Sequence, residues 1–358
     1  MTEACLGRPG VRPAEPGEFT RRAFEHGKLD LAEAEGLADL VDAETEGQRC
    51  QALRQMQGEL SAVYERWRAQ LIEAMALLEA AIDFPDEDLP ADLAARVGPL
   101  VDAISADLAR HLNDSHRGER VRDGYRIAII GAPNAGKSSL LNALARREAA
   151  IVSALPGTTR DVVEVRLVLA GFPVWIADTA GLREAADAVE AEGVRRALQR
   201  AEEADLRIAV VDGDAGDLAV DVTRSLRARD LIVLSKADLP GRAGALLTEG
   251  LVDTLDLHRL LVSTVEGVGL GELEDLLSQR VAAELAGDEA PALTRARHRA
   301  LVTGALAAMG RGREVLALRP ELAAEDLRLA ATALGRLTGR IDVEDLLDEV
   351  FSSFCIGK

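Results

Sequence analysis

A glycine-rich segment near the middle of the chain has the residue types and spacing of a phosphate-binding loop. It starts at Gly131 and ends in Gly136-Lys137-Ser138, after an apolar run and before a helical one. In such a loop the glycines let backbone N–H groups approach phosphate oxygens, the lysine neutralises the β- and γ-phosphates, and the serine hydroxyl binds Mg²⁺. A chance glycine-rich turn is the alternative, and the flanking patterns argue against it. The candidate nucleotide-binding residues here are Asn134, Ala135, Gly136, Lys137, Ser138 and Ser139.

Three later segments follow in the order expected of a guanine-nucleotide site. Asp178-Thr179-Ala180-Gly181 ends an expected strand, where the acid can reach Mg²⁺ through water and the glycine N–H can contact the γ-phosphate. In Ser235-Lys236-Ala237-Asp238 the last carboxylate can accept hydrogen bonds from guanine N1 and N2, which adenine cannot offer. Ser263-Thr264 follows another strand, where a backbone N–H can meet guanine O6. The order of these segments predicts binding and hydrolysis of GTP rather than ATP.

Three further positions bear on the reaction. Thr159, in the polar segment between the first two motifs, is the candidate to complete Mg²⁺ coordination with Ser138. Leu182 stands where Ras uses a water-orienting glutamine, and a leucine cannot orient water, so another group must do so. Asn134 could hold a monovalent cation beside the phosphates in place of an arginine finger, although capping of the loop is the simpler role.

The elements that must position these residues alternate between strand and helix in the middle of the chain and are helical on both sides. Strands are expected at 126–130, 162–169, 174–177, 207–211, 231–234 and 260–263, with helices at 139–145 and 271–285. Apolar residues at steps of three and four predict long amphipathic helix from 29 to 82, a further helix at 91–112 and helices from 292 to the end, broken at Pro320. Residues 113–124 read as a polar linker, and residues 1–28 as irregular chain or short strands.

The two helical flanks, 29–120 and 286–358, are expected to pack together as one domain. Neither flank alone can bury its apolar face, and an α/β domain of about 160 residues inserted at 121–285 is an ordinary domain size. Loop tips tolerate such insertions. The expected fold is therefore an α/β phosphate-loop domain, with a mixed and mostly parallel sheet, inserted into an all-α domain.

Composition excludes several classes of protein. The net charge of −19 leaves no generic basic surface for nucleic acid, so any RNA contact has to be local or supplied by a partner. Three scattered cysteines form neither a disulfide framework nor a CxxC metal site. No run of 18 apolar residues predicts a membrane span and no signal peptide is recognisable, so a cytoplasmic protein is expected. Because arginine fills nearly every basic position, the only four lysines are candidate site residues: Lys28, Lys137, Lys236 and Lys358.

Several segments beyond the nucleotide motifs resemble a known family. They are Pro16-Gly17-Glu18-Phe19-Thr20-Arg21-Arg22-Ala23-Phe24, Lys28-Leu29-Asp30-Leu31-Ala32-Glu33-Ala34-Glu35, Ala80-Ala81-Ile82-Asp83-Phe84-Pro85 and the terminal Phe351-Ser352-Ser353-Phe354-Cys355-Ile356-Gly357-Lys358. The central domain resembles the Ras-like, potassium-activated GTPases. The whole chain, from about residue 8 to its end, resembles the tRNA modification GTPases called MnmE or TrmE.

The resemblance implies a homodimer that acts with the FAD-dependent protein MnmG on tRNA. Together they would form 5-(carboxymethyl)aminomethyluridine, or the aminomethyl product, at the wobble position (U34), with 5-formyl- or methylene-tetrahydrofolate as carbon donor. Hydrolysis of GTP would need Mg²⁺ and K⁺, with K⁺ held by Asn134, Ser153, Leu155 and Thr158. Ser153 and Thr158 would then also lie beside the nucleotide.

The same resemblance assigns further roles to individual residues. Glu190 would activate water through a second water, and Lys137 would act in catalysis. Cys355, in the terminal Cys-Ile-Gly-Lys motif, matches a functionally important thiol, with structural burial as its alternative role. Lys28 and Lys358 match positions of the folate site.

The sequence departs from the family at two places. Members begin with roughly 90 more residues, a domain-sized length. Residues 1–28 would then be a remnant of an N-terminal α+β domain that binds tetrahydrofolate and dimerises, so that either the start lies upstream or this copy is truncated. Ser235 replaces an asparagine that touches the purine and braces the phosphate loop. The shorter side chain is expected to leave room for a water and to weaken nucleotide affinity.

Two other functions stay open on the sequence. One is a GTPase switch in the assembly of ribosomes or other RNA particles. The other is a truncated interaction protein that binds nucleotide without modifying tRNA. The terminal motif and the two folate-site lysines favour tRNA modification over the first of these.

Overall fold

The computed structural model describes residues 10–83, 93–114, 116–147, 164–178, 199–212, 220–239, 256–287, 292–341 and 347. The chain divides into two units. One unit joins residues 1–122 to residues 288–358, and the other comprises Asp123–Gly287. The second unit is therefore inserted in the sequence of the first.

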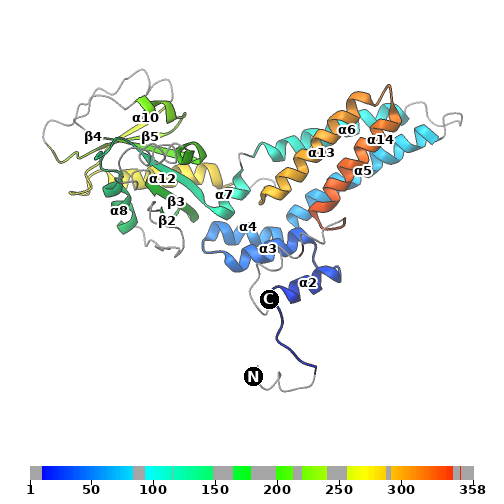
Figure 1. Cartoon of the computed structure of the whole chain (residues 1–358), viewed down its shortest axis with the longest axis horizontal. Coiled ribbons are helices and arrows are strands. Elements are labelled where there is room, and N and C mark those ends of the chain that lie inside the picture. The colour runs from blue at the N-terminus through cyan, green and yellow to red at the C-terminus, as the bar shows by residue number, and fades with distance from the viewer. Residues whose placement is uncertain are drawn as a thin grey trace, which may run out of the picture. The chain divides into compact units, whose positions relative to one another are not determined.

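The inserted unit is built on a six-stranded sheet with the order β2-β3-β1-β4-β5-β6 (Figure 1). A hairpin joins β2 to β3 through Ala170 and Gly171, whose φ angles of 51° and 82° suit a tight turn, and these two strands are antiparallel. All other neighbours are parallel, which confirms the expected mixed and mostly parallel sheet. The strands are β1 (Tyr125–Ile130), β2 (Glu164–Leu169), β3 (Phe172–Asp178), β4 (Leu206–Asp212), β5 (Leu231–Ser235) and β6 (His258–Leu261).

Helices lie against both faces of this sheet. On one face, α8 (Lys137–Arg147) and α12 (Leu270–Leu285) pack against β1, β2 and β3. On the other, apolar side chains of β1, β4 and β5 form a core with Ala201, Ala204 and Leu226, next to α10 (Val220–Ser225). The carboxyl ends of β1, β3, β4 and β5 meet at one edge, because these strands are parallel. The segments singled out in the sequence follow these ends.

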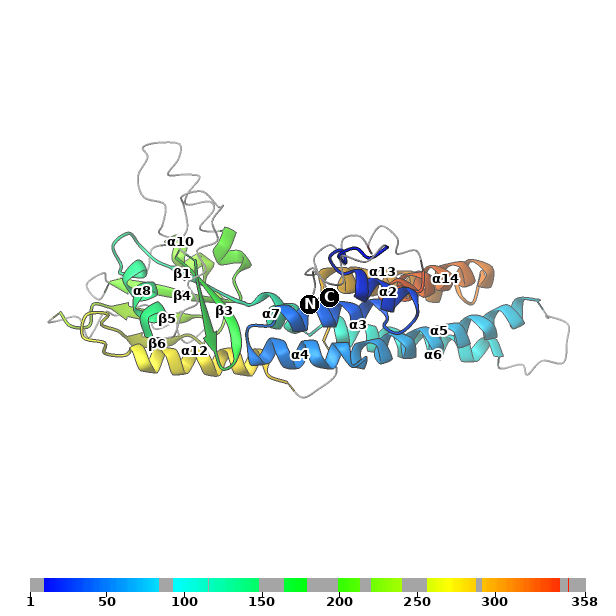
Figure 2. The same cartoon turned by 90° about the horizontal axis from the view of Figure 1, so that it is seen from below.

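The helical unit is a four-helix bundle with a smaller group of helices beside it (Figure 2). The bundle consists of α5 (Glu59–Asp83), α6 (Leu93–Leu112), α13 (Ala296–Val315) and α14 (Pro320–Leu337). Its core contains fully buried side chains from before and after the insertion, among them Trp67, Leu108 and Met309. The two helical flanks therefore complete one core, as the sequence predicts. None of the described helices is long and apolar enough to cross a membrane.

Three local features differ from the sequence expectation. The helical stretch from 29 to 82 is three helices, α3 (Leu31–Asp42), α4 (Glu46–Met56) and α5. Capping boxes at Asp30 and Thr45 begin α3 and α4, and Gly58 at φ 86° separates α4 from α5. Helix α2 (Glu18–Glu25) lies in the segment expected to be irregular, and α7 (Arg117–Asp123) lies in the expected polar linker.

Candidate nucleotide site

The phosphate loop connects β1 to α8 and depends on close backbone contact. A Cβ atom at Gly131, where φ is 152°, would stand 2.3 Å from the carbonyl oxygen of Val210 in β4. Asn134 and Gly136 also have positive φ angles, 61° and 99°. The loop therefore has its glycines where side chains would clash or strain the backbone, as a phosphate-binding loop requires.

Lys137, at the start of α8, points its ammonium group back over this loop. Its Nζ donates to the carbonyl oxygens of Gly131 at 2.8 Å and of Ala132 at 2.7 Å. Burial lowers the pKa of Lys137, and the nearby Asp178 carboxylate opposes this shift. The side chain is 5% exposed, so water screens its charge only weakly. The ammonium group lies at the loop, where phosphate oxygens would bind.

Ser138 and Asp178 bring two oxygen donors together beside the loop. The Ser138 hydroxyl donates to Asp178 Oδ2 at 2.5 Å, and Asp178 itself is buried. A hydroxyl and a carboxylate that converge in this way fit Mg²⁺, which prefers oxygen ligands and completes its shell with phosphates and water. Among the described residues no group of three or more histidine, cysteine or acidic side chains could hold a metal ion.

Ser235 at the end of β5 contacts the phosphate loop directly. Its Oγ lies 2.6 Å from the carbonyl oxygen of Ala135 and 3.1 Å from that of Val211. The side chain is 7% exposed. Ser235 therefore braces the phosphate loop, because the loop and the end of β5 lie close enough for a hydroxyl to join them, and the weaker nucleotide affinity stays a prediction.

The segment predicted to contact the guanine base, Ser235-Lys236-Ala237-Asp238, makes side-chain contacts with two neighbouring parts of the unit. Ser263 Oγ donates to Asp238 Oδ1 at 2.7 Å and accepts the Glu266 backbone N–H at 3.1 Å. The Lys236 ammonium lies 2.5 Å from Asp212 Oδ2, at the end of β4. The Ser263 contact fixes the direction of the Asp238 carboxylate, and among the described residues its second oxygen is left for a ligand.

Sequence reasoning missed two of these partners. Ser263 was assigned for its backbone, but its fully buried side chain also orients Asp238. Asp212 was not singled out at all, although an acid directly after an apolar strand is a recognisable signal. Thr264 follows Ser263 and is half-buried.

Other predicted site residues lie outside the described residues. They are Ser153, Leu155, Thr158, Thr159, Thr179, Ala180, Gly181, Glu190, Cys355 and Lys358. Of the two lysines assigned to folate, Lys28 is described, and it is exposed in the turn after α2. The structure therefore brings the phosphate loop, Ser138, Asp178 and Asp238 to one edge of the sheet, and the ligand roles of these residues stay predictions, as do the K⁺ and folate assignments.

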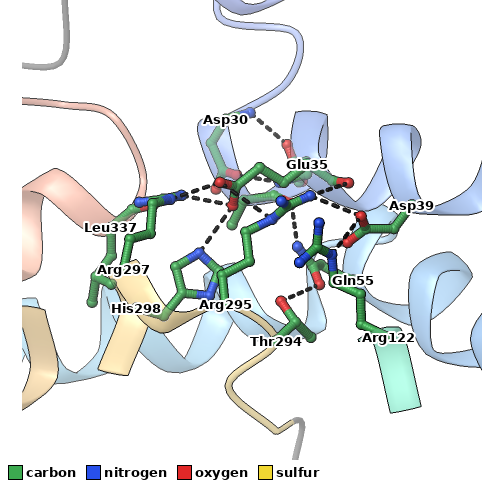
Figure 3. Close-up of polar contacts among 12 residues, drawn as sticks. Asp30, Glu35, Asp39, Gln55, Arg122, Thr294, Arg295, Arg297, His298 and Leu337 are labelled. Atoms are coloured by element: carbon green, nitrogen blue, oxygen red, sulfur yellow. Dashed lines mark hydrogen bonds and ion pairs between the residues drawn. The ribbon is translucent and has the colours of Figure 1, made fainter. Parts of the chain in front are cut away.

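A second cluster of charged residues lies inside the helical unit (Figure 3). Glu35 of α3, 1% exposed, accepts hydrogen bonds from Arg297 Nε and Nη2, both at 2.6 Å. The ring of His298 lies 2.9 Å from the same carboxylate through Nε2. Burial alone would raise the pKa of Glu35, but His298 and Arg297 together hold it well below its usual range. Burial lowers the pKa of His298.

The neighbouring carboxylate of Asp39 joins the two ends of the insertion. Its Oδ1 accepts from Arg122 Nε at 3.0 Å and from Arg295 Nη2 at 2.8 Å. Arg122 is the last residue before the inserted unit, and Arg295 follows shortly after the chain returns. Sequence reasoning missed this cluster, because each member alone resembles an ordinary surface charge.

Comparisons with known proteins agree with both units. A protein-family model described as the MnmE helical domain matches residues 31–355. A relative named tRNA modification GTPase MnmE in Parvibaculum lavamentivorans is 56% identical over 100% of this chain and 79% of its own length. A relative of the same name in Maricaulis maris is 58% identical over 99% of this chain and 79% of its own length. Among solved structures, the G domain of the T. maritima FeoB iron transporter matches 44% of this chain over 98% of its own length, at 23% identity and a TM-score of 0.33.

Proposed function

Because this chain belongs to the MnmE family of tRNA modification GTPases, we propose that its GTP hydrolysis drives the modification of uridine 34 in tRNA. As a member of this family the chain is a GTP hydrolase. The product would be 5-(carboxymethyl)aminomethyluridine, made in the cytoplasm together with the FAD-dependent protein MnmG. The observation that carries the nucleotide part of this proposal is the convergence of Lys137, Ser138 and Asp178 at one edge of the sheet.

The reaction at the γ-phosphate is proposed to use K⁺ where other GTPases use an arginine finger. Asn134 supports this assignment, because it is exposed on the phosphate loop with a φ of 61°, and its amide oxygen is a suitable ligand for a monovalent cation. K⁺ would compensate charge that develops between the phosphates. Ser153, Leu155 and Thr158 would complete its shell, Thr159 would join Ser138 on Mg²⁺, and Glu190 would activate the attacking water in the absence of a glutamine at 182.

The K⁺ role is tested by measuring GTP hydrolysis in KCl and in NaCl at equal ionic strength. We expect a rate about 100-fold higher in KCl, the scale of a lost transition-state contact, and loss of that difference in Asn134→Ala. Asn142→Ala is the matched control, since Asn142 is exposed on α8 away from the loop. Equal rates in the two salts for the unmodified chain would remove K⁺ from the mechanism.

The tRNA part of the proposal is tested by nucleoside analysis. The chain is combined with the FAD-dependent partner, tRNA, GTP and a one-carbon tetrahydrofolate, and the modified uridine is measured by mass spectrometry. Product formation supports the proposal. GTP hydrolysis without any modified uridine would favour a switch in RNA-particle assembly, and nucleotide binding without hydrolysis would favour an interaction protein.

The folate and dimer assignments belong to the same proposal. Lys28 and Lys358 would pair with the cofactor, Cys355 would act near it, and two copies of the chain would associate as a homodimer. Ammonium groups suit the carboxylates of a folate, and the exposed position of Lys28 makes its side chain available. Binding of 5-formyl-tetrahydrofolate to the chain, and its loss in Lys28→Ala, is the direct measurement.

A further inference from the structure

The side chain of Ser235 has a single hydrogen-bond donor, its hydroxyl group, and the structure shows which acceptors this donor meets. Its Oγ faces the carbonyl oxygens of Ala135, at 2.6 Å, and of Val211, at 3.1 Å. Both neighbours are acceptors, and a hydroxyl group donates one hydrogen bond at a time. With the side chain 7% exposed, the proton is committed to backbone oxygens, most closely to the phosphate loop.

Because the hydroxyl of Ser235 donates to the backbone, position 235 has no further donor for a purine base. An asparagine amide carries two N–H donors, so one can brace the loop while the other reaches a base nitrogen. A serine side chain is also shorter, and Ser235 packs against the loop itself: a Cβ atom at Gly136 would lie 3.5 Å from both Ser235 Cβ and Oγ. The side chain of Ser235 therefore braces the loop and has no second N–H or O–H donor for N7 of guanine.

The N1 and N2 edge of guanine would be contacted by residues whose positions do not depend on Ser235. Asp238 is oriented by Ser263 at 2.7 Å, and Lys236 is tied to Asp212 at 2.5 Å, neither of which involves Ser235. The carboxylate remains able to accept from guanine N1 and N2.

We propose that this chain selects guanine without reading N7, because Ser235 donates its single proton to the phosphate loop and selection is left to the contacts at N1, N2 and O6. The inference rests on the proposed binding of guanine nucleotides at this site. It predicts that a nucleotide in which N7 is replaced by carbon binds as tightly as the natural one. It also predicts that the position can be converted to read N7 by restoring a second donor.

The test compares binding of GDP, 7-deaza-GDP and IDP to the whole chain by calorimetry. For the unmodified chain we expect GDP and 7-deaza-GDP to bind within about 2-fold of each other, and IDP, which lacks the N2 amino group, to bind about 10-fold more weakly. Ser235→Asn should bind GDP about 10-fold more tightly than 7-deaza-GDP. Ser235→Ala, which lacks the loop contact, should weaken both nucleotides equally.

The possible outcomes distinguish a failure of the N7 inference from a failure of the proposed binding of guanine nucleotides. A 10-fold loss for 7-deaza-GDP in the unmodified chain would overturn the inference while leaving GTPase function intact. A larger loss for GDP than for 7-deaza-GDP in Ser235→Ala would also overturn it, because the hydroxyl would then be contacting N7, which only GDP carries. Failure of GDP itself to bind the folded chain would instead count against the proposed function.

Discussion

Arg297 donates two hydrogen bonds of 2.6 Å to the carboxylate of Glu35, which lies 262 residues earlier in the chain. Glu35 belongs to α3, before the inserted unit, and Arg297 belongs to α13, after it. The pair therefore closes the helical unit around the insertion. Since Glu35 is 1% exposed, its charge has no access to water that could replace the arginine.

Removal of the Glu35 charge should destabilise the helical unit. Glu35→Gln leaves the Arg297 charge uncompensated, and we expect the free energy of unfolding to fall by about 3 kcal/mol. The measurement is urea unfolding followed by Trp67 fluorescence in a Trp175→Phe background, because Trp67 lies in the core of the bundle. Glu59→Gln is the control: Glu59 pairs with Arg54 at the surface, and its loss should cost less than about 1 kcal/mol. Equal effects of the two substitutions would contradict the assigned role of the buried pair.

Stability should fall as the pH drops below neutrality. The pKa of Glu35 is held well below 4.5 in the fold, so its contribution is complete above 4.5 and is lost as the pH falls further. The pKa of His298 is lowered from 6.5 by burial, so the unfolded chain takes up a proton first, and stability is lost as the pH falls through 6.5. Urea midpoints at pH 7.5, 6.0 and 5.0 should therefore decrease in that order. His298→Gln should flatten the decrease between pH 6.5 and 5, and a midpoint that rises on acidification would be incompatible with both shifts.

Two helix glycines should respond to alanine in opposite directions. A Cβ atom at Gly36 of α3 would stand 2.6 Å from the backbone nitrogen of Met56, so Gly36→Ala should separate α3 from α4 and cost about 1–3 kcal/mol. Gly304 of α13 has no atom within 4 Å of that position. Gly304→Ala should therefore stabilise the helix by about 1 kcal/mol. Thermal denaturation of the two variants measures both effects, and a stabilising Gly36→Ala would mean that the α3–α4 contact is not close.

Loss of the Ser263 hydroxyl should weaken nucleotide binding. Ser263→Ala removes the bond that orients Asp238, and we expect about 10-fold weaker binding of GDP, the scale of a hydrogen bond to a charged group. Ser278→Ala on α12 serves as the control, because it removes a hydroxyl from the same unit away from the site. Unchanged affinity in Ser263→Ala would show that Asp238 keeps its direction without this contact.

The sequence by itself determined the phosphate loop, the order of the motifs and the strand–helix alternation. These are local properties, since the spacing of glycines, a lysine and a serine within eight residues decides which backbone can form. It also gave the inserted arrangement, because neither helical flank could bury its apolar residues alone. The ends of α3 and α4 were missed, although Thr45 and Gly58 carried the signals.

Only the tertiary structure decided which polar groups meet. Ser235 and Ala135 are 100 residues apart, and Glu35 and Arg297 are 262 residues apart. Nothing in the local pattern distinguishes the fully buried Glu35 from the half-buried acids Asp30 and Glu33 beside it, because its burial depends on where α13 returns after the insertion. A sequence motif indicates which donors and acceptors are present at a site. The hydrogen-bond partner of each one depends on how elements distant in the sequence pack together.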